Sequence, residues 1–201
     1  ETPVTLPDAV YSHVGVYAAS DWAAMQALGV TWFSVVAQCF PNPMFDKAGK
    51  NFDSYNGAFN PNYNGDGSLT IPHTGDWGDG GINLSGFVRV GTKYHISVTI
   101  PVGMSPTDNL AFRVTNNYDY WSDANNSGVK YAEVSYDGNG GVYSVDVTPT
   151  DGMWLWLEAS QNTKNAMEYS HVGVYTAADW QAMQSLGIDW FSGDEYGKVS
   201  Q

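Results

Sequence analysis

The fold is decided by TKYHISVTI, residues 92–100, where large apolar side chains alternate with smaller or polar ones. The apolar set comprises Tyr94, Ile96, Val98 and Ile100. Successive side chains of a strand point to opposite faces, so this period predicts a β-strand with one buried face. His95 would then lie on the opposite face, away from the core.

The same alternation continues along the chain in LAFRVT (110–115) and MWLWLEA (153–159). Residues 131–149 predict two further strands around a glycine-rich turn. Residues 47–81 are rich in Asn, Gly and Asp, and predict one or two short strands within long loops. Strands separated by turns about every 8–12 residues predict an all-β fold, an antiparallel β-sandwich.

A near-identical segment flanks this β-rich region: YSHVGVYAASDWAAMQALGVTWFS at 11–34 and YSHVGVYTAADWQAMQSLGIDWFS at 169–192. Of the 24 positions, 18 are identical. Each copy predicts a strand, a helix of about ten residues ended by glycine, and a second strand. Thr176 and Asp179 have the spacing of a capping box.

A helix this short is unstable alone. We therefore expect Trp22 and Trp180 to pack it onto a neighbouring domain or onto sister chains, rather than to contact a ligand. The repeat divides the chain into a lead-in and first connector (1–37), a sandwich (38–161) and a second connector (162–201).

The charge balance excludes several partners. Lys and Arg total 8 against 21 Asp and Glu, giving a net charge of −13. Nucleic acids and anionic membranes both need a basic footprint, so neither is expected as a partner. No apolar run is long enough to span a membrane, so membrane insertion is not expected either.

Two fragments resemble a known family. FPNPMFD (40–46) resembles the opening strand of jelly-roll carbohydrate-binding modules of families 4, 9 and 22. GGINLSGFVRVGTKYHISVTI (80–100) resembles their turn leading into a central strand, and MWLWLEA resembles their final core strand. The resemblance implies a jelly roll over about 40–160, and recognition of a glycan without catalysis.

The repeated segments resemble those between sugar-binding-like modules in minor tail and baseplate proteins of bacteriophages of Gram-positive bacteria. This resemblance implies an extracellular location, on a virion or a bacterial surface, and a host cell-wall polysaccharide as the partner in receptor binding and host adhesion. The alternative is a structural spacer or oligomerisation module without a ligand of its own.

The family resemblance also implies a possible structural calcium. Asp46 matches the acidic residue of the first strand. The paired aspartates that the family carries late in the chain are missing in this sequence, where Leu157 and Glu158 stand instead. No other cofactor is expected.

A sugar site needs an exposed aromatic plane with hydrogen-bonding groups beside it. The segment NNYDYWSDANN (116–126) combines aromatic rings with amides and carboxylates, and Trp77 and Tyr63 lie in Gly- and Asn-rich loops. Trp154 and Trp156 alternate against Leu155 and Leu157 and are expected to face outward, as a sugar-binding surface or a patch covered by a connector helix. The candidate ligand-binding residues are Trp121, Tyr120, Tyr118, Trp77, Trp154, Trp156, Tyr63, Arg113 and Asn117.

Arg113 alternates against Phe112 and Val114 and is expected on the face opposite the core. Its planar donors suit sugar hydroxyls. A salt bridge to Asp146 or Glu133 is the structural alternative. No nucleophile, zinc or phosphate-binding motif occurs in the sequence, so no enzyme is expected.

Overall fold

The computed structural model describes residues 39–41, 45, 52–55, 60–72, 79–117, 130–159 and 165–191, with Ala23 as an isolated position. The chain divides into two units, Glu1–Val36 and Ala37–Gln201. In the first unit only Ala23 is described, and it is helical. The expected first connector therefore lies almost wholly outside the described residues.

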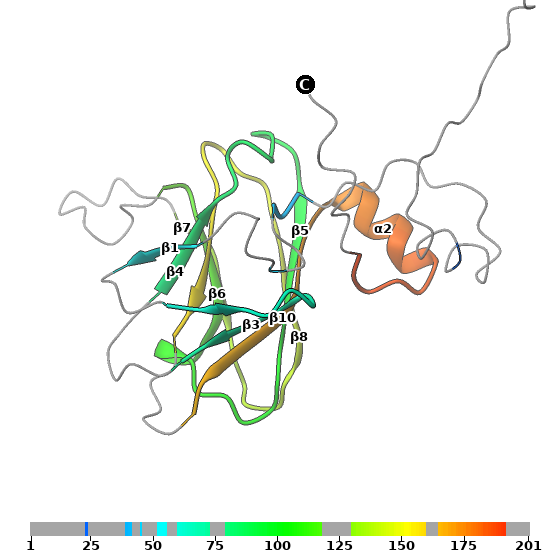
Figure 1. The fold of residues 1–201 in the computed structure, drawn as a ribbon. Coiled ribbons are helices and arrows are strands. Elements are labelled where there is room, and N and C mark those ends of the chain that lie inside the picture. Colours follow the sequence, from blue (N-terminus) through cyan, green and yellow to red (C-terminus); the bar gives the residue numbers. More distant parts are fainter. Residues whose placement is uncertain are drawn as a thin grey trace, which may run out of the picture. The chain divides into compact units, whose positions relative to one another are not determined.

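The second unit is an antiparallel β-sandwich jelly roll, as expected (Figure 1). Sheet A has the strand order β1-β4-β9-β6-β7 and sheet B the order β2-β3-β10-β5-β8. The strands are β1 Asp53–Tyr55, β2 Asn62–Tyr63, β3 Ser68–Ile71, β4 Asp79–Asn83, β5 Tyr94–Ile100, β6 Leu110–Thr115, β7 Lys130–Ser135, β8 Gly141–Val147, β9 Trp154–Glu158 and β10 Met167–Thr176. A 3-10 turn, η1 Thr107–Asn109, precedes β6, and the helix α2 Ala177–Ser185 follows β10.

The core lies between the sheets and contains the apolar residues that the alternation selects. All four apolar residues of 92–100 are buried in it, as are Phe112 and Val114 of β6 and Leu155 and Leu157 of β9. The period of these strands therefore predicts correctly which side chains face the other sheet.

One region differs from its expectation: residues 47–81 contain β1, β2, β3 and the start of β4, more strands than the one or two expected. The two strands expected in 131–149 are present as β7 and β8. They belong to different sheets, where β7 pairs with β6 and β8 pairs with β5. Alternation fixes which way a side chain points, and it carries no information on which strand lies alongside.

The end of the sandwich also differs from the boundary expected at residue 161. Strand β10, which opens the second repeat copy, lies between β3 and β5 in sheet B. Val172 and Val174 are fully buried in the core. The second copy is therefore part of the sandwich, because its strand pairs along both edges.

Helix α2 begins and ends as its sequence indicates. The Thr176 hydroxyl accepts a hydrogen bond from the Asp179 amide (3.1 Å) and donates one to Asp179 Oδ2 (2.7 Å). At the other end Gly187 has φ +68°, and its amide donates to the Gln184 carbonyl while the Ile188 amide donates to that of Met183. This pair of bonds is a Schellman motif, which needs a left-handed residue at the glycine.

The helix and the residues after it cover the outer face of sheet B. Trp180 stacks on His95 with ring centroids 4.0 Å apart, which confirms packing as its role. The expected strand after the helix is absent among the described residues 186–191. There Trp190 Nε1 donates to the Val172 carbonyl, and the Tyr175 hydroxyl bonds to the backbone of Phe191.

Replacing Thr176 by Ala should lower the free energy of unfolding by about 1 kcal/mol, because it removes the helix N-cap. Thr176→Ser keeps the hydroxyl and should retain most of the stability. Urea unfolding of both variants measures the difference, and equal losses in the two would show that the cap bonds do not stabilise the helix.

Candidate functional site

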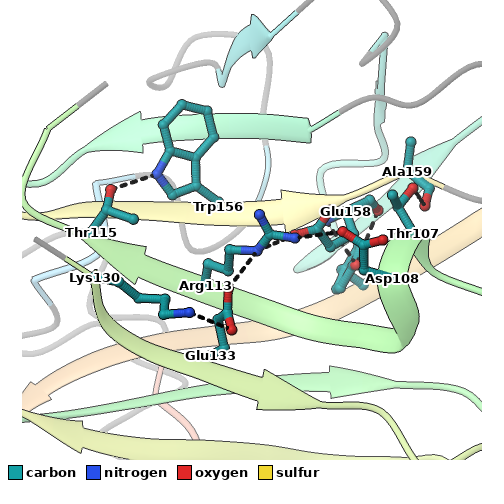
Figure 2. A network of polar contacts seen from close by, with 10 residues as sticks. Thr107, Asp108, Arg113, Thr115, Lys130, Glu133, Trp156, Glu158 and Ala159 are labelled. Carbon is teal, nitrogen blue, oxygen red and sulfur yellow. Dashed lines mark hydrogen bonds and ion pairs between the residues drawn. The ribbon is translucent and has the colours of Figure 1, made fainter. Parts of the chain in front are cut away.

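The outer face of sheet A carries the charged and aromatic groups that the sequence singled out (Figure 2). In the register of its strands, Trp156 of β9 lies beside Gly81 of β4 and Arg113 of β6. Arg113 in turn lies beside Glu133 of β7. The four strands β4, β9, β6 and β7 therefore place the Trp156 ring next to the ion pair of Arg113 and Glu133 in one row across the sheet.

Trp156 forms the floor of this face. Its indole Nε1 donates a hydrogen bond of 2.8 Å to Thr115 Oγ1. Its ring lies flat over Gly81, where an added Cβ would come within 2.6 Å of the ring carbon Cζ3. The ring of Trp154 stacks beside it, with centroids 5.7 Å apart and planes at 21°.

Both tryptophans point away from the core, as expected, but their exposure differs. Trp154 is half-buried, whereas Trp156 is 0 % exposed. Of the two alternatives left open for these tryptophans, an exposed sugar-binding surface or a covered patch, the burial of Trp156 fits a covered position for that ring. Trp154 is the ring of this pair that a ligand could reach.

Arg113 is also enclosed on this face, at 2 % exposed. Its guanidinium lies 3.1 Å from Asp108 Oδ2, 3.3 Å from Glu158 Oε1 and 3.6 Å from Glu133 Oε1. The expected salt bridge to Glu133 is therefore present, whereas Asp146 belongs to another cluster. A buried guanidinium needs such partners, since an uncompensated charge is costly away from water.

Glu158 is the least accessible carboxyl group of the network. It is 0 % exposed and lies beside Asp79 in the register of β4 and β9. Burial raises the pKa of Glu158 well above its usual value, and the hydrogen bond to Asp79 and the charge of Asp79 raise it further. The Tyr169 hydroxyl accepts from the Glu158 amide and donates to its carbonyl, which fixes this end of the strand.

The rim of the face is more open. The side chains of Glu133, Asp108 and Lys130 are 33 %, 42 % and 41 % exposed. Lys130 Nζ lies 2.8 Å from Glu133 Oε2, so these rim groups are held by the same network as Arg113. The more accessible groups of this face are thus the half-buried indole of Trp154 and the charged groups of Glu133, Asp108 and Lys130.

A second polar cluster lies on sheet B and was missed by the search for site residues. Asp146 Oδ1 lies 2.8 Å from His95 Nδ1, and Asp146 Oδ2 lies 2.8 Å from Lys93 Nζ. The stacked Trp180 covers the imidazole of His95, whose side chain is 10 % exposed. The alternation of β5 places His95 on this face, but the covering helix lies some 80 residues further along the chain.

Of the remaining candidate residues, the structure describes Tyr63 and Asn117. Tyr63 is half-buried, its hydroxyl accepts a bond from the Phe52 amide (3.1 Å), and its ring packs near Phe45. The Asn117 carbonyl accepts from Thr115 Oγ1 (2.9 Å). The candidates Tyr118, Tyr120, Trp121, Trp77 and Asp46 lie outside the described residues.

The described part of the chain contains no group of three His, Cys, Asp or Glu side chains arranged to hold a metal ion. Since Asp46 lies outside that part, the structural calcium stays a prediction. None of the helices in the described ranges is long and apolar enough to cross a membrane.

Comparisons with known proteins find solved structures with a similar fold. No protein family matches the sequence, and no curated protein does. The chain is similar to the CBM22-1 xylan-binding domain of Paenibacillus barcinonensis Xyn10C, at 15 % identity and TM-score 0.49, over 72 % of this chain and 97 % of that one. It is similar to the CBM22-1-CBM22-2 tandem domain of the same protein at 15 % identity and TM-score 0.48, over 72 % and 47 %.

A third solved structure is that of the CBM22-1-GH10 modules of Clostridium thermocellum Xyn10B, complexed with xylohexaose. It is 13 % identical with a TM-score of 0.42, over 71 % of this chain and 28 % of that one.

The close approach of Trp156 to Gly81 gives a stability prediction. Gly81→Ala should lower the free energy of unfolding by about 1–3 kcal/mol, because the new methyl group overlaps the indole. Gly86→Ala is the matched control, since nothing lies within 4 Å of its Cβ position. Equal stability of the two variants in urea unfolding would contradict the packing of Trp156 on β4.

The raised pKa of Glu158 gives a pH prediction. Below the unfolded-state pKa of about 4.3, Glu158 is protonated in both the folded and the unfolded protein, so its ionisation does not change the free energy of unfolding. As the pH rises above that value, the unfolded state ionises first, so Glu158 lowers stability up to its raised folded-state pKa.

Glu158→Gln removes this penalty. Its stability relative to the wild type should therefore increase with pH above about 4.5, by at most about 1.4 kcal/mol per pH unit, until the pH reaches the raised folded-state pKa of Glu158. Urea unfolding across this range measures the trend. A difference between the two proteins that stays constant with pH would contradict a protonated Glu158.

Proposed function

We propose that this chain is a non-catalytic carbohydrate-binding module, and that the outer face of sheet A is its glycan-binding surface. The observation that carries this proposal is the half-buried Trp154, stacked on Trp156 on the sheet face that also carries the charged groups of Glu133, Asp108 and Lys130. A sugar ring presents apolar C–H faces to an indole and hydroxyl groups to its neighbours, so it needs both kinds of group on one surface.

The buried floor supports this role by holding the rim in place. Trp156 is fixed by Thr115 and Gly81, and it backs the ring of Trp154. Arg113 lies within ion-pair distance of both Asp108 and Glu133. A rim fixed before the ligand arrives loses less conformational entropy on binding, which favours affinity.

The finer proposal concerns the parent protein. The repeated segments and the acidic surface fit a module of an extracellular bacterial surface or phage tail protein that recognises a host polysaccharide. Binding at one such face would be weak, and repetition of modules would raise the overall affinity. The solved structures of similar fold include xylan-binding domains, so xylan is the first of the polysaccharides to test.

A second candidate is a structural spacer or oligomerisation module. Its supporting observation is the enclosure of Trp156, Arg113 and Glu158, which leaves few groups of the network for a ligand. If the chain is such a spacer or oligomerisation module, Trp154 would contact another protein subunit.

The test is binding of the intact chain to an array of xylans, other plant glycans and bacterial cell-wall polysaccharides. Trp154→Ala should weaken binding at least about tenfold, equivalent to about 1.4 kcal/mol, because the stacking surface is lost. Phe87→Ala is the control, since Phe87 is 42 % exposed and lies outside the sheet A network. Unchanged circular dichroism of both variants shows that the fold persists.

Two results would reject this assignment. If Trp154→Ala binds polysaccharide as tightly as the wild type, the binding site does not lie at Trp154 on sheet A. Failure of the intact chain to bind any polysaccharide, together with a sedimentation mass above that of a monomer, would favour the spacer.

A further inference from the structure

The second repeat copy occupies a defined place in the sandwich. Its strand β10 pairs with β3 through Met167–Ser170 and with β5 through Ser170–Thr176. Its helix α2 and the residues after it then cover the outer face of sheet B. The slot between β3 and β5, with this outer face, is therefore the docking surface for one copy of the repeat.

The differences between the two copies avoid the residues that are buried in this contact. Every buried residue of the second copy is identical in the first: Tyr169, Val172, Gly173, Val174, Tyr175 and Met183 match Tyr11, Val14, Gly15, Val16, Tyr17 and Met25. Substitutions occur only at residues that are exposed or half-buried: Thr176, Ala178, Gln181, Ser185, Ile188 and Asp189. The first copy thus carries the full set of side chains that β10 and α2 bury.

Glycine at 173 is the most restrictive of these matches. The Tyr175 ring lies over it, so an added Cβ would come within 2.5 Å of Tyr175 Cε2 and 3.1 Å of Ser97 Oγ. The first copy retains both partners of this contact, as Gly15 and Tyr17. A strand selected only as a solvent-exposed connector would have no need of a glycine two residues before a tyrosine.

We propose that residues 11–34 dock as the final strand and covering helix of a second sandwich of this kind, between its β3 and β5. The sandwich of the same chain is already complete, since β10 pairs along both edges there. In the second copy Thr176 caps the helix, whereas the corresponding residue of the first copy is Ala18. A side-chain cap raises the equilibrium constant for helix formation by about a factor of five. The first copy therefore serves another sandwich.

The partner is thus a sandwich of this kind that has no repeat copy of its own in the β10 position, because a sandwich that carries one is already complete. Donation of a strand from one unit into the sheet of the next uses main-chain hydrogen bonds for affinity and side-chain pockets for specificity. Because donor segment and acceptor slot are different surfaces, the contact is head-to-tail and links units into a row. This inference is independent of the glycan-binding proposal.

Two full-length variants, both with Cys39→Ala, test the proposal by a disulfide trap. The donor carries Ser12→Cys, the counterpart of Ser170, whose Cα partner in β5 is Thr99. The acceptor carries Thr99→Cys, with Gly173→Val and Gly15→Val to exclude both of its own copies from the slot. A single chain with Ser170→Cys and Thr99→Cys is the positive control for the geometry of the bond.

Mixing donor and acceptor under oxidising conditions should give a disulfide-linked heterodimer and restore the near-UV circular dichroism of the acceptor. Adding Gly15→Val to the donor should abolish both signals, because the strand then no longer fits under Tyr17. The proposal is overturned if no heterodimer forms while the positive control crosslinks. It is equally overturned if the acceptor stays unfolded in the mixture, or if the Gly15→Val donor crosslinks as well as the original.

Discussion

The pairing of β10 between β3 and β5 is the constraint on which sheet B depends. Without it, β2 and β3 would lose their only link to β5 and β8, since no other strand of the described sheet joins these pairs. The strand also contributes Val172 and Val174 to the core and Tyr175 to the outer face. A segment that looks like an appendage in the sequence is therefore what completes the fold.

Both sheets use the same device on their outer faces: an aromatic ring packed flat over a glycine. Trp156 lies over Gly81 on sheet A, and Tyr175 lies over Gly173 on sheet B. In each case the missing side chain lets a large ring lie against the backbone, where it gains contact area and excludes water. The ring on sheet A supports Trp154 at the candidate glycan surface, while the ring on sheet B lies beneath Trp180 of the covering helix.

The sequence predicted the inward and outward faces of the strands correctly, together with the sandwich class, the cap at Thr176 and the end of the helix at Gly187. It placed Trp156 and Arg113 each on the face of its strand away from the core, but it did not show that the two lie side by side or decide whether they are exposed. Exposure depends on which other segments approach a face, and alternation within one strand does not encode that. For the same reason, repeat identity marked the second copy as a unit without indicating that its strand pairs inside the sheet.

Native-state hydrogen exchange would test the central role of β10 most directly. If this strand holds sheet B together, the backbone amides of β10 that pair with β5 should exchange as slowly as those of β5 itself, through global unfolding. If β10 and α2 are an appended connector, their amides should exchange by local opening, much faster than those of β5. The first result would establish the repeat as an integral strand of the sandwich, and the second would contradict that role.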